Sequence, residues 1–457
     1  MADAGHSKLN PQEKIRLHST AWRVFRYGMI TGVVGLVAAV VVAKYLSGEE
    51  GLRRFYFAYI TSYAFFLSLS LGGLFFVLIN HLTRAGWSVV VRRPAEVLAA
   101  NVWILAVLAA PIGLALLTTG GEVYPWADPI YAEAAHGARH AQTAADPGLI
   151  VTVADNAPPH GVAGDSRSGV VDHHVLGKRA YLNKPFFIAR WVIYFAAWSL
   201  MGVWYWRQST LQDRTGDPAH TRRMEAFAAP ALVVFAMTLT FASFDLIMTL
   251  EPTWYSTMFG VYYFGGAVIG ALALLIIKLR ILQRYAYLRT SVTVEHYHDL
   301  GKLLFGFVFF WGYIAFSQYM LIWYANIPTE MPWLVKHGMT TVPEDVNAWS
   351  YVVILLLFGQ FVIPFVGLMS RHAKRNVRVL TFWAIWLLVF HWVDLYWLVM
   401  PSFATPRTWP PFGAIEVGCL LGIGGIYIIS GTKLATYHSL IPTQDPRLAE
   451  SLAFENL

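Results

Sequence analysis

Ten stretches of this 457-residue chain are mainly apolar, and each is long enough to cross a lipid bilayer as an α-helix. Crossing the hydrocarbon takes roughly 20 apolar residues, because each helical residue adds only about 1.5 Å. The stretches lie near residues 22–46, 55–81, 95–118, 185–206, 227–250, 255–280, 300–325, 349–370, 378–399 and 411–435. They predict an all-α integral membrane protein with about ten transmembrane helices.

Composition and charge exclude several classes of function. Hydrophobic residues make up 56% of the chain and charged residues only 13%, which is far from the balance of a soluble domain. The net charge of +7 comes from basic residues scattered in short loops, with no basic patch or RNA-reading motif, so we expect lipid and not nucleic acid as a partner. The single cysteine, Cys419, excludes a disulfide framework and a cysteine-ligated iron–sulfur cluster or c-type haem in this chain.

The distribution of Lys and Arg predicts the orientation. Cytoplasmic loops carry an excess of these residues, and here they collect at both termini and in the even-numbered connections between spans. Both termini are therefore predicted to be cytoplasmic. The chain then divides into a cytoplasmic segment (1–21), helices 1–3 (22–118), a long outer loop (119–184), helices 4–5 (185–250), helices 6–9 (255–399), helix 10 (411–435) and a cytoplasmic tail (436–457).

The outer loop 119–184 is rich in Asp, Ala, Gly and His and far exceeds the usual connection between packed helices. Histidine often binds metal, and the loop contains five histidines: His136, His140, His160, His173 and His174. Their spacing matches no strong metal site, so we predict no metal centre and interpret the loop as a solvated docking surface or plug.

Two predicted helices end in the same pattern. One contains Phe241, Asp245-Leu246 and Pro252, and the other contains Phe390, Asp394-Leu395 and Pro401, so both read F-x-x-x-D-L followed by five residues and Pro. Because these are spans five and nine, which run in the same direction, the match indicates two parallel four-helix units, helices 2–5 and 6–9, flanked by helices 1 and 10. The alternative is a chance match in a sequence rich in Phe and Leu.

The predicted orientation places several ionisable side chains at similar depth, in the outer half of the membrane. These are Arg190, Asp245, Glu251, His391, Asp394 and Glu416. A carboxylate deep in a helix costs about 2.5–3.5 kcal/mol to insert, so each acid needs a partner, water or a proton. His391 and Asp394 are three residues apart on one helix face, where they can exchange a proton or form an ion pair.

Two interpretations of these acids remain open. Asp245 with Arg190, and Asp394 with His391, can be internal ion pairs that hold helices together, or they can line a polar pocket that conducts protons or adjoins a quinone. At the inner end, His298, Asp299 and Lys302 are candidates for the start of an inner half-channel, although an ordinary solvated helix start with Asp near its N-terminus is the favoured explanation.

Aromatic and amide residues near the outer acids are candidates for a quinone pocket. Together with Arg190 they are Tyr255, Gln318, Tyr319, Trp323 and Tyr396. Tyr and Trp are also common at the membrane boundary, where they anchor helices without binding a ligand. Gln360, in the middle of the eighth span, is expected to hydrogen-bond between helices.

Three runs carry a resemblance to a known family. They are TLTFASFDLIMTLEPTWYSTMFGVYYFGG (238–266), LLFGFVFFWGYIAFSQYMLIWYANIP (303–328) and FHWVDLYWLVMP (390–401). They resemble the second large membrane subunit of alternative complex III, which belongs to the NrfD-like, polysulfide-reductase-type membrane family. The resemblance is specific in these runs and elsewhere rests on the pattern of spans.

The resemblance implies a quinol:electron-acceptor oxidoreductase in a prokaryotic inner membrane. It implies three kinds of partner: a sister NrfD-like subunit that is the better candidate for quinol oxidation, a periplasmic iron–sulfur protein, and multihaem cytochromes c. This chain would have a supporting role in binding menaquinol or another quinone or in moving protons, with no redox cofactor of its own. Asp245, Glu251, His391 and Asp394 lie in the motif-bearing helices, but no catalytic role carries over to any of them.

Other functions predict different sequence features. A cytochrome b-type subunit needs two deep histidines on facing helices, and His391 is the only histidine deep in a predicted span. An ion-coupled secondary transporter suits a repeat with membrane acids, but it favours helices that are broken at matching midplane positions, whereas Pro252 and Pro401 fall at helix ends. A purely structural membrane anchor remains the third possibility.

Overall fold

The computed structural model describes residues 9–10, 12–17, 19–48, 50–131, 173–328, 330–340, 342–403 and 409–456. In this part of the chain the regular elements are helices, and no strand is formed. Ten helical segments are long and apolar enough to span a membrane. The prediction of an all-α membrane protein with about ten transmembrane helices is confirmed.

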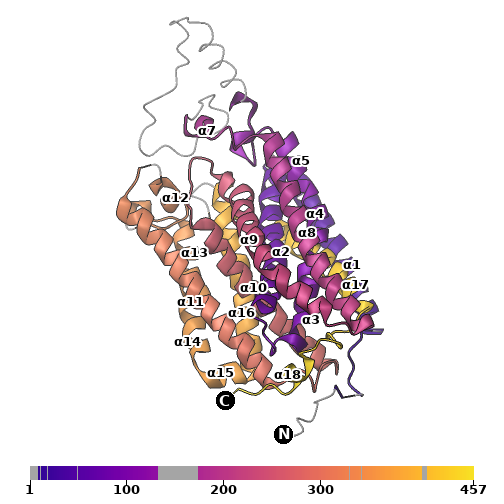
Figure 1. Cartoon of the computed structure of the whole chain (residues 1–457). Coiled ribbons are helices and arrows are strands. Elements are labelled where there is room, and N and C mark those ends of the chain that lie inside the picture. Colours follow the sequence, from indigo (N-terminus) through magenta and orange to yellow (C-terminus); the bar gives the residue numbers. More distant parts are fainter. Residues whose placement is uncertain are drawn as a thin grey trace, which may run out of the picture.

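The ten spans consist of continuous and interrupted helices (Figure 1). In chain order they are α1 (Ser19–Val41) with the π-helical turn η1 (Val42–Leu46), α2 (Gly51–Leu82), α3 (Val89–Ala100) with α4 (Val102–Leu108) and α5 (Ala110–Thr118), α8 (Lys184–Thr215), α9 (Ala219–Leu246), α10 (Phe259–Arg284), α11 (Val294–Ala325), α13 (Ala348–Leu356) with the π-helical turn η5 (Leu357–Val362) and α14 (Ile363–Met369), α16 (Val377–Val399) and α17 (Ala414–Thr436).

Shorter helices and 3-10 turns lie in the connections. They are η2 (Pro125–Ala127), α7 (His173–Gly177), η3 (Met248–Leu250), α12 (Met331–Lys336), η4 (Pro343–Asp345), α15 (Arg371–Arg375), η6 (Met400–Ser402) and α18 (Leu448–Leu452).

Local signals in the sequence set several helix ends. Asn183 begins α8 by accepting a 3.0 Å hydrogen bond from the backbone N–H of Phe186, and Gly216 ends it in the left-handed conformation. The helix therefore continues to Thr215, beyond the apolar stretch that ends near residue 206. The difference arises because hydropathy marks only the lipid-embedded part of a helix, while polar residues continue it into water.

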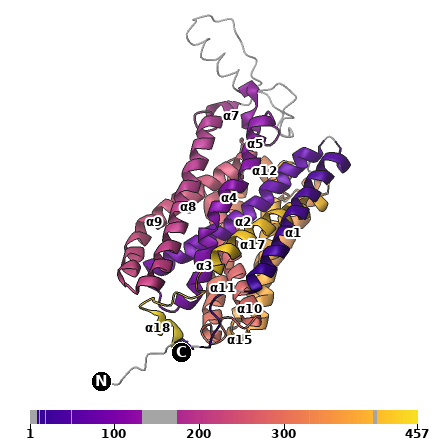
Figure 2. The ribbon, with the colours of Figure 1, turned by 90° about the vertical axis from the view of Figure 1, so that its right-hand side faces the viewer.

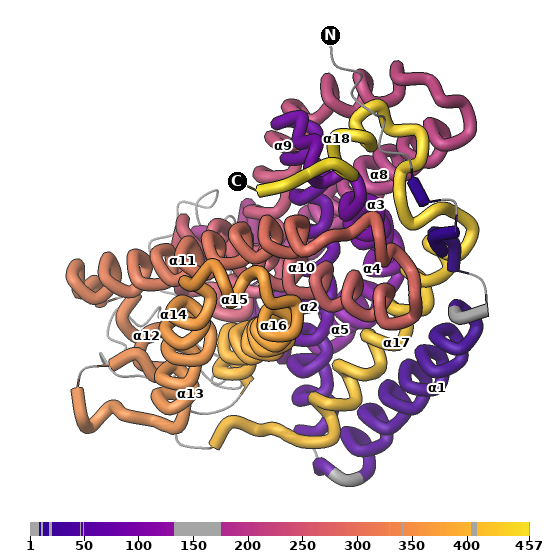
Figure 3. Tube along the Cα trace, turned by 90° about the horizontal axis from the view of Figure 1, so that it is seen from below, coloured from indigo at the N-terminus to yellow at the C-terminus, as the bar shows by residue number. Residues whose placement is uncertain are grey.

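The spans form two four-helix units. In the first unit α2, α3–α5, α8 and α9 contact one another in a ring, and in the second unit α10, α11, α13–α14 and α16 do the same. The units meet where α2 packs against α10 and α16, which Figure 3 shows from below. The prediction of two bundles, helices 2–5 and 6–9, with helices 1 and 10 flanking them, is confirmed.

The flanking helices α1 and α17 pack closely against each other (Figure 2). A Cβ on Gly35 would lie 2.7 Å from the backbone nitrogen of Gly422, so only glycine permits this approach. Small residues at helix crossings are the usual means of close packing in a membrane, where the hydrophobic effect does not drive helices together.

The described N-terminal segment 12–17 and the C-terminal tail lie at the same end of the bundle (Figure 1), which we call the terminal end. The C-terminal tail runs beneath the helices there: the Leu440 N–H donates to the carbonyl of Ile15 at 2.7 Å, and the Ser451 hydroxyl donates to the carbonyl of Trp87 at 2.7 Å. The tail thus ties the first unit to the N-terminal segment.

The described parts of the loop 119–184 lie over the first unit at the opposite end of the bundle. Tyr124 and Trp126 are buried, with ring centroids 5.6 and 5.2 Å from that of Phe187. His136, His140 and His160 lie outside the described residues, and His173 and His174 begin α7 with side chains that are not described.

Candidate functional site

In each unit the repeated motif places one aspartate near the end of the bundle that lies away from the terminal end. Asp245 lies in the last turn of α9, and Asp394 lies in the last turns of α16. Both are fully buried. The two carboxyl groups share sequence pattern, depth and burial, so the partners that each one finds decide what it can do.

Asp245 is held by a cation. The Arg190 guanidinium donates to both carboxylate oxygens at 2.8 Å, and the Tyr194 hydroxyl donates to one of them at 2.9 Å. Arg190 also donates to the Tyr181 carbonyl at 2.8 Å and lies 3.7 Å from the centroid of the Tyr181 ring. The carboxylate is therefore neutralised and hydrogen-bonded on both oxygens, which corresponds to the packing interpretation of this residue.

Asp394 has only neutral hydrogen-bond partners. It accepts a short hydrogen bond from the Tyr262 hydroxyl of α10, and the indole of Trp311 flanks the same carboxyl. Among the residues that the structure describes, no Lys, Arg or His forms an ion pair with it. The carboxyl must therefore hold a proton or have its charge stabilised by neutral donors alone.

His391 does not pair with Asp394, although the two share a helix face. Its Nε2 lies 2.7 Å from the Ser68 hydroxyl of α2, and its Nδ1 has no hydrogen-bond partner. The ring rests on α10, where a Cβ on Gly266 would lie 2.9 Å from the imidazole Cε1. Each side chain therefore bonds to a different neighbouring helix, which overrides the three-residue spacing.

The other acids predicted at this depth form separate ion pairs. Glu416 accepts two 2.8 Å hydrogen bonds from Arg54 and one of 2.7 Å from the Gly413 N–H. Glu251 pairs with Lys336 of α12. The structure therefore distributes the acids over several closed contacts and does not gather them in one cluster.

The inner candidates lie near the terminal end, away from Asp394. Asp299 pairs with Lys302, whose ammonium group also donates to Asn456 at 3.0 Å, and Nδ1 of His298 has no hydrogen-bond partner. Asp299 and Trp311 are twelve residues apart on α11, or about 18 Å along the helix.

The candidates for a quinone pocket contact different neighbours. Tyr255 is 54% exposed beside Lys178, and Gln318 accepts a 3.3 Å hydrogen bond from Ser256. Tyr319 and Trp323 stack on each other along α11, while Tyr396 is buried and donates to the Pro411 carbonyl. A hollow of about 430 Å³ beside α11 is lined by Met258, Tyr313, Phe316, Ser317, Met320 and Leu321, so none of the candidates contributes to its lining.

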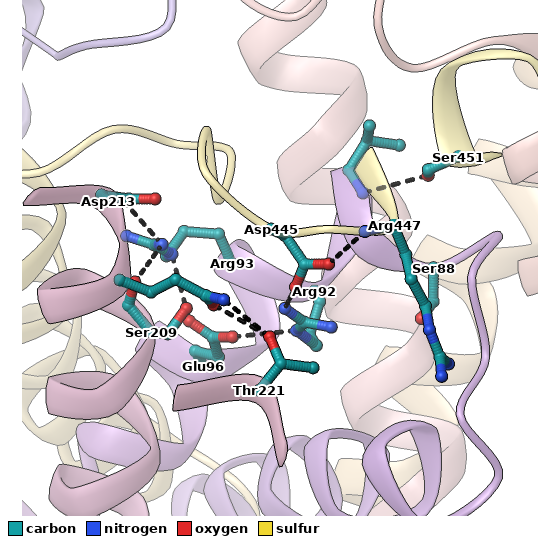
Figure 4. Close-up of polar contacts among 12 residues, drawn as sticks. Ser88, Arg92, Arg93, Glu96, Ser209, Asp213, Thr221, Asp445, Arg447 and Ser451 are labelled. Atoms are coloured by element: carbon teal, nitrogen blue, oxygen red, sulfur yellow. Dashed lines mark hydrogen bonds and ion pairs between the residues drawn. The ribbon is translucent and has the colours of Figure 1, made fainter. Parts of the chain in front are cut away.

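A buried charge network at the terminal end was missed by sequence reasoning (Figure 4). Arg92 bonds to Asp445 at 2.5 Å and to Glu96 at 3.1 Å, and Arg93 bonds to Asp213 at 2.8 Å and lies 3.1 Å from Glu96. Both arginines and Glu96 are almost fully buried. The available signal was a glutamate three and four residues after two arginines, which is the spacing of helical ion pairs. The network joins α3, α8 and the tail.

His337 was also missed, and it lies between the seventh and eighth spans in a stack of aromatic rings. The rings of Trp254 and Trp333 are 4.0 Å apart, as are those of Trp333 and His337. His337 Nδ1 donates to the Trp333 carbonyl at 2.9 Å, and the Trp397 indole donates to the His337 carbonyl at 2.9 Å. Burial lowers the pKa of His337 to about 3.

This lowered pKa predicts acid sensitivity. Below pH of about 6.5 the unfolded chain takes up a proton at this histidine and the folded protein does not, so stability falls toward pH 3. Between pH 7 and 5 the loss should be about 2 kcal/mol. Denaturant unfolding of the detergent-purified protein at both values, beside His337→Gln, measures it; equal pH dependence in the two proteins would contradict the assignment.

Comparison with protein-family models and with the curated proteins identifies no relative. No protein-family model matches the chain, and none of the curated proteins is significantly similar to it. Among the described residues, no three metal-binding side chains come together. The candidate site is therefore defined by its own geometry: a buried Asp394 with Tyr262, beside His391 with Ser68.

Proposed function

We propose that the chain is an integral membrane subunit of a quinol:electron-acceptor oxidoreductase of the alternative complex III type, and that its second unit moves protons during quinol oxidation. The observation that carries the proton role is the difference between the two copies of the motif. Asp245 is neutralised by Arg190, whereas Asp394 has only neutral hydrogen-bond partners. A carboxyl that is not tied to a cation can change its protonation state without breaking an ion pair.

The groups around Asp394 suit proton transfer. Tyr262 brings a hydroxyl directly to the carboxyl, and His391 brings an imidazole bonded to the Ser68 hydroxyl at 2.7 Å. Hydroxyl and imidazole groups both donate and accept protons, so each can pass one on when its hydrogen bonds reverse. Asp394 would take up a proton from one side and release it to the other, with no net change in this chain.

The redox part of the proposal rests on the resemblance of the three sequence runs. A sister NrfD-like subunit would oxidise menaquinol or another quinol, and a periplasmic iron–sulfur protein and multihaem cytochromes c would take the electrons. The chain would lie in a prokaryotic inner membrane with the terminal end in the cytoplasm, as the excess of Lys and Arg there favours. Asp394 would then lie toward the periplasmic side.

Asp394→Asn tests the proton role. The variant keeps the size of the side chain and its contact with Tyr262, so we expect the complex to assemble. In proteoliposomes, either the rate of quinol oxidation should fall at least about tenfold, which corresponds to about 1.4 kcal/mol or more of activation free energy, or the number of protons released per turnover should fall. Quinol oxidation and external pH would be recorded together.

The matched control is Asp345→Asn, the same chemical change at an exposed aspartate of η4. It should leave both quantities unchanged. Wild-type proton release and turnover in an assembled Asp394→Asn complex would overturn the proton role.

A structural anchor is the second candidate, and the saturated Arg190–Asp245 pair favours it for the first unit. The transporter alternative gains no such support. The helical interruptions lie in the third span, between α3, α4 and α5, and in the eighth, at η5, which are not corresponding helices of the two units.

A further inference from the structure

Gln360 is a buried side chain with unused hydrogen-bonding capacity. It lies in η5, a π-helical turn in the middle of the eighth span, and it is fully buried. Neither its amide nitrogen nor its amide oxygen has a hydrogen-bond partner, contrary to the expectation that it bonds between helices. An amide buried without partners is costly, and π-helical turns within α-helices are often found at functional sites.

The neighbours of Gln360 place it level with the candidate site. Gly359 packs directly on the Phe390 ring and accepts a 2.7 Å hydrogen bond from the Trp386 indole of α16. Phe361 packs directly on Gly312 of α11. Gln360 stands between these two contacts, and His391 and Trp311 adjoin Phe390 and Gly312 in the sequence. The three side chains therefore come from three helices at one level of the second unit.

The other two side chains at this level also have unused atoms. Nδ1 of His391 lacks a hydrogen-bond partner, the indole N–H of Trp311 flanks the Asp394 carboxyl without a regular hydrogen bond to it, and both side chains are buried. In the first unit the Trp198 indole donates to Thr238 at 2.9 Å and the Tyr194 hydroxyl donates to Asp245. Unsatisfied polar atoms occur in both units, and Gln360 is the buried amide of the second unit in which neither polar atom has a partner.

We propose that ordered water occupies the interior of the second unit between α11, η5 and α16, bound by Gln360, Trp311 and His391. The chemistry matches, because the amide offers donors and an acceptor, the indole offers one donor, and imidazole Nδ1 offers either role depending on its tautomer. Buried water typically makes two to four such bonds to groups that lack protein partners. This inference rests on the proposed function in one respect, that the water would carry protons between Asp394 and the middle of the membrane.

Radiolytic hydroxyl labelling tests it in the intact purified protein, because radicals formed from bound water oxidise the side chains beside it. Trp311 is 4% exposed, so bulk water alone should label it poorly. We expect Trp311 to be labelled in the wild-type protein, and the rate to fall at least fivefold in Gln360→Leu. Absence of Trp311 labelling in the wild type, or an unchanged rate in Gln360→Leu, overturns the proposal.

Thermal unfolding gives a second readout on the same variants. If the site is dry, Gln360→Leu removes an unpartnered amide and raises the melting temperature; if water is bound, it deprives that water of partners and lowers the temperature. Gln212→Leu is the matched control, since Gln212 is a buried glutamine of the first unit that bonds directly to Thr221. It should lower the melting temperature without changing Trp311 labelling.

The labelling requires no turnover, so the two proposals can fail separately. A labelled Trp311 together with normal proton release in Asp394→Asn would keep the hydrated site and reject its proton role. An unlabelled Trp311 with impaired release in Asp394→Asn would reject the water and keep the role of Asp394.

Discussion

Asp245→Asn is expected to destabilise the protein by about 3–5 kcal/mol, because it leaves the Arg190 guanidinium buried without a counter-ion. Arg190 is 6% exposed, and its charge is balanced by two 2.8 Å hydrogen bonds to this carboxylate. Asparagine retains one acceptor but no charge. Denaturant unfolding in mild detergent, followed by tryptophan fluorescence, would measure the loss.

The double variant Arg190→Met with Asp245→Leu separates two contributions to stability: the penalty of a buried unpaired charge and the net stabilisation by the ion pair. Removing both charges leaves no unpaired ion, so its stability should be closer to that of the wild type than either single variant is. If Asp245→Asn is as stable as the wild type, the pair does not hold α8 to α9, and the anchoring role of the first unit is wrong.

Gly72→Ala is expected to disrupt the contact between the two units. A Cβ at this position of α2 would lie 2.2 Å from the backbone oxygen of Ala267 and 2.6 Å from the Cβ of Ala271, both on α10. Backbone cannot move aside as a flexible side chain can, so the helices must separate along their contact. Overpacking in a close-packed interior typically costs about 1–3 kcal/mol, and here we expect the upper end or more.

Gly306→Ala is the matched control, since it makes the same change on an exposed face of α11, where a Cβ meets nothing within 4 Å. Alanine favours a helix over glycine by roughly 1 kcal/mol, so this variant should be equally or more stable than the wild type. Equal stability of the two alanine variants, measured by the yield of monodisperse protein and its melting temperature, would contradict the close approach of α2 and α10.

The ten spans and their grouping were predictable because they follow from length and pattern. A polypeptide in hydrocarbon must satisfy its backbone hydrogen bonds internally, so an apolar stretch of sufficient length becomes a helix whatever its neighbours are. The repeated motif around Asp245 and Asp394 then indicated which helices form equivalent units. Helix ends were less predictable, since α8 and α11 extend beyond their apolar stretches.

The site was predictable in its residues but not in its contacts. Sequence gives the depth of a side chain and its helix face, and this identified Asp394 and His391 as buried. It does not give the side chain across the interface, so the bonds to Tyr262 and Ser68 on other helices could not be read from it. For the same reason the contacts of the candidates for a quinone pocket, which were chosen by depth, could not be read from it.

By itself the sequence determined that this chain spans a membrane ten times, that two of its helices carry the same buried aspartate, and that each of those acids requires a partner or a proton. Only the tertiary structure decided between the open interpretations: Asp245 does pair with Arg190, whereas Asp394 meets Tyr262 and not His391. The physical reason is that insertion into lipid depends on each helix separately, whereas the environment of a buried charge depends on which side chains the neighbouring helices bring to it.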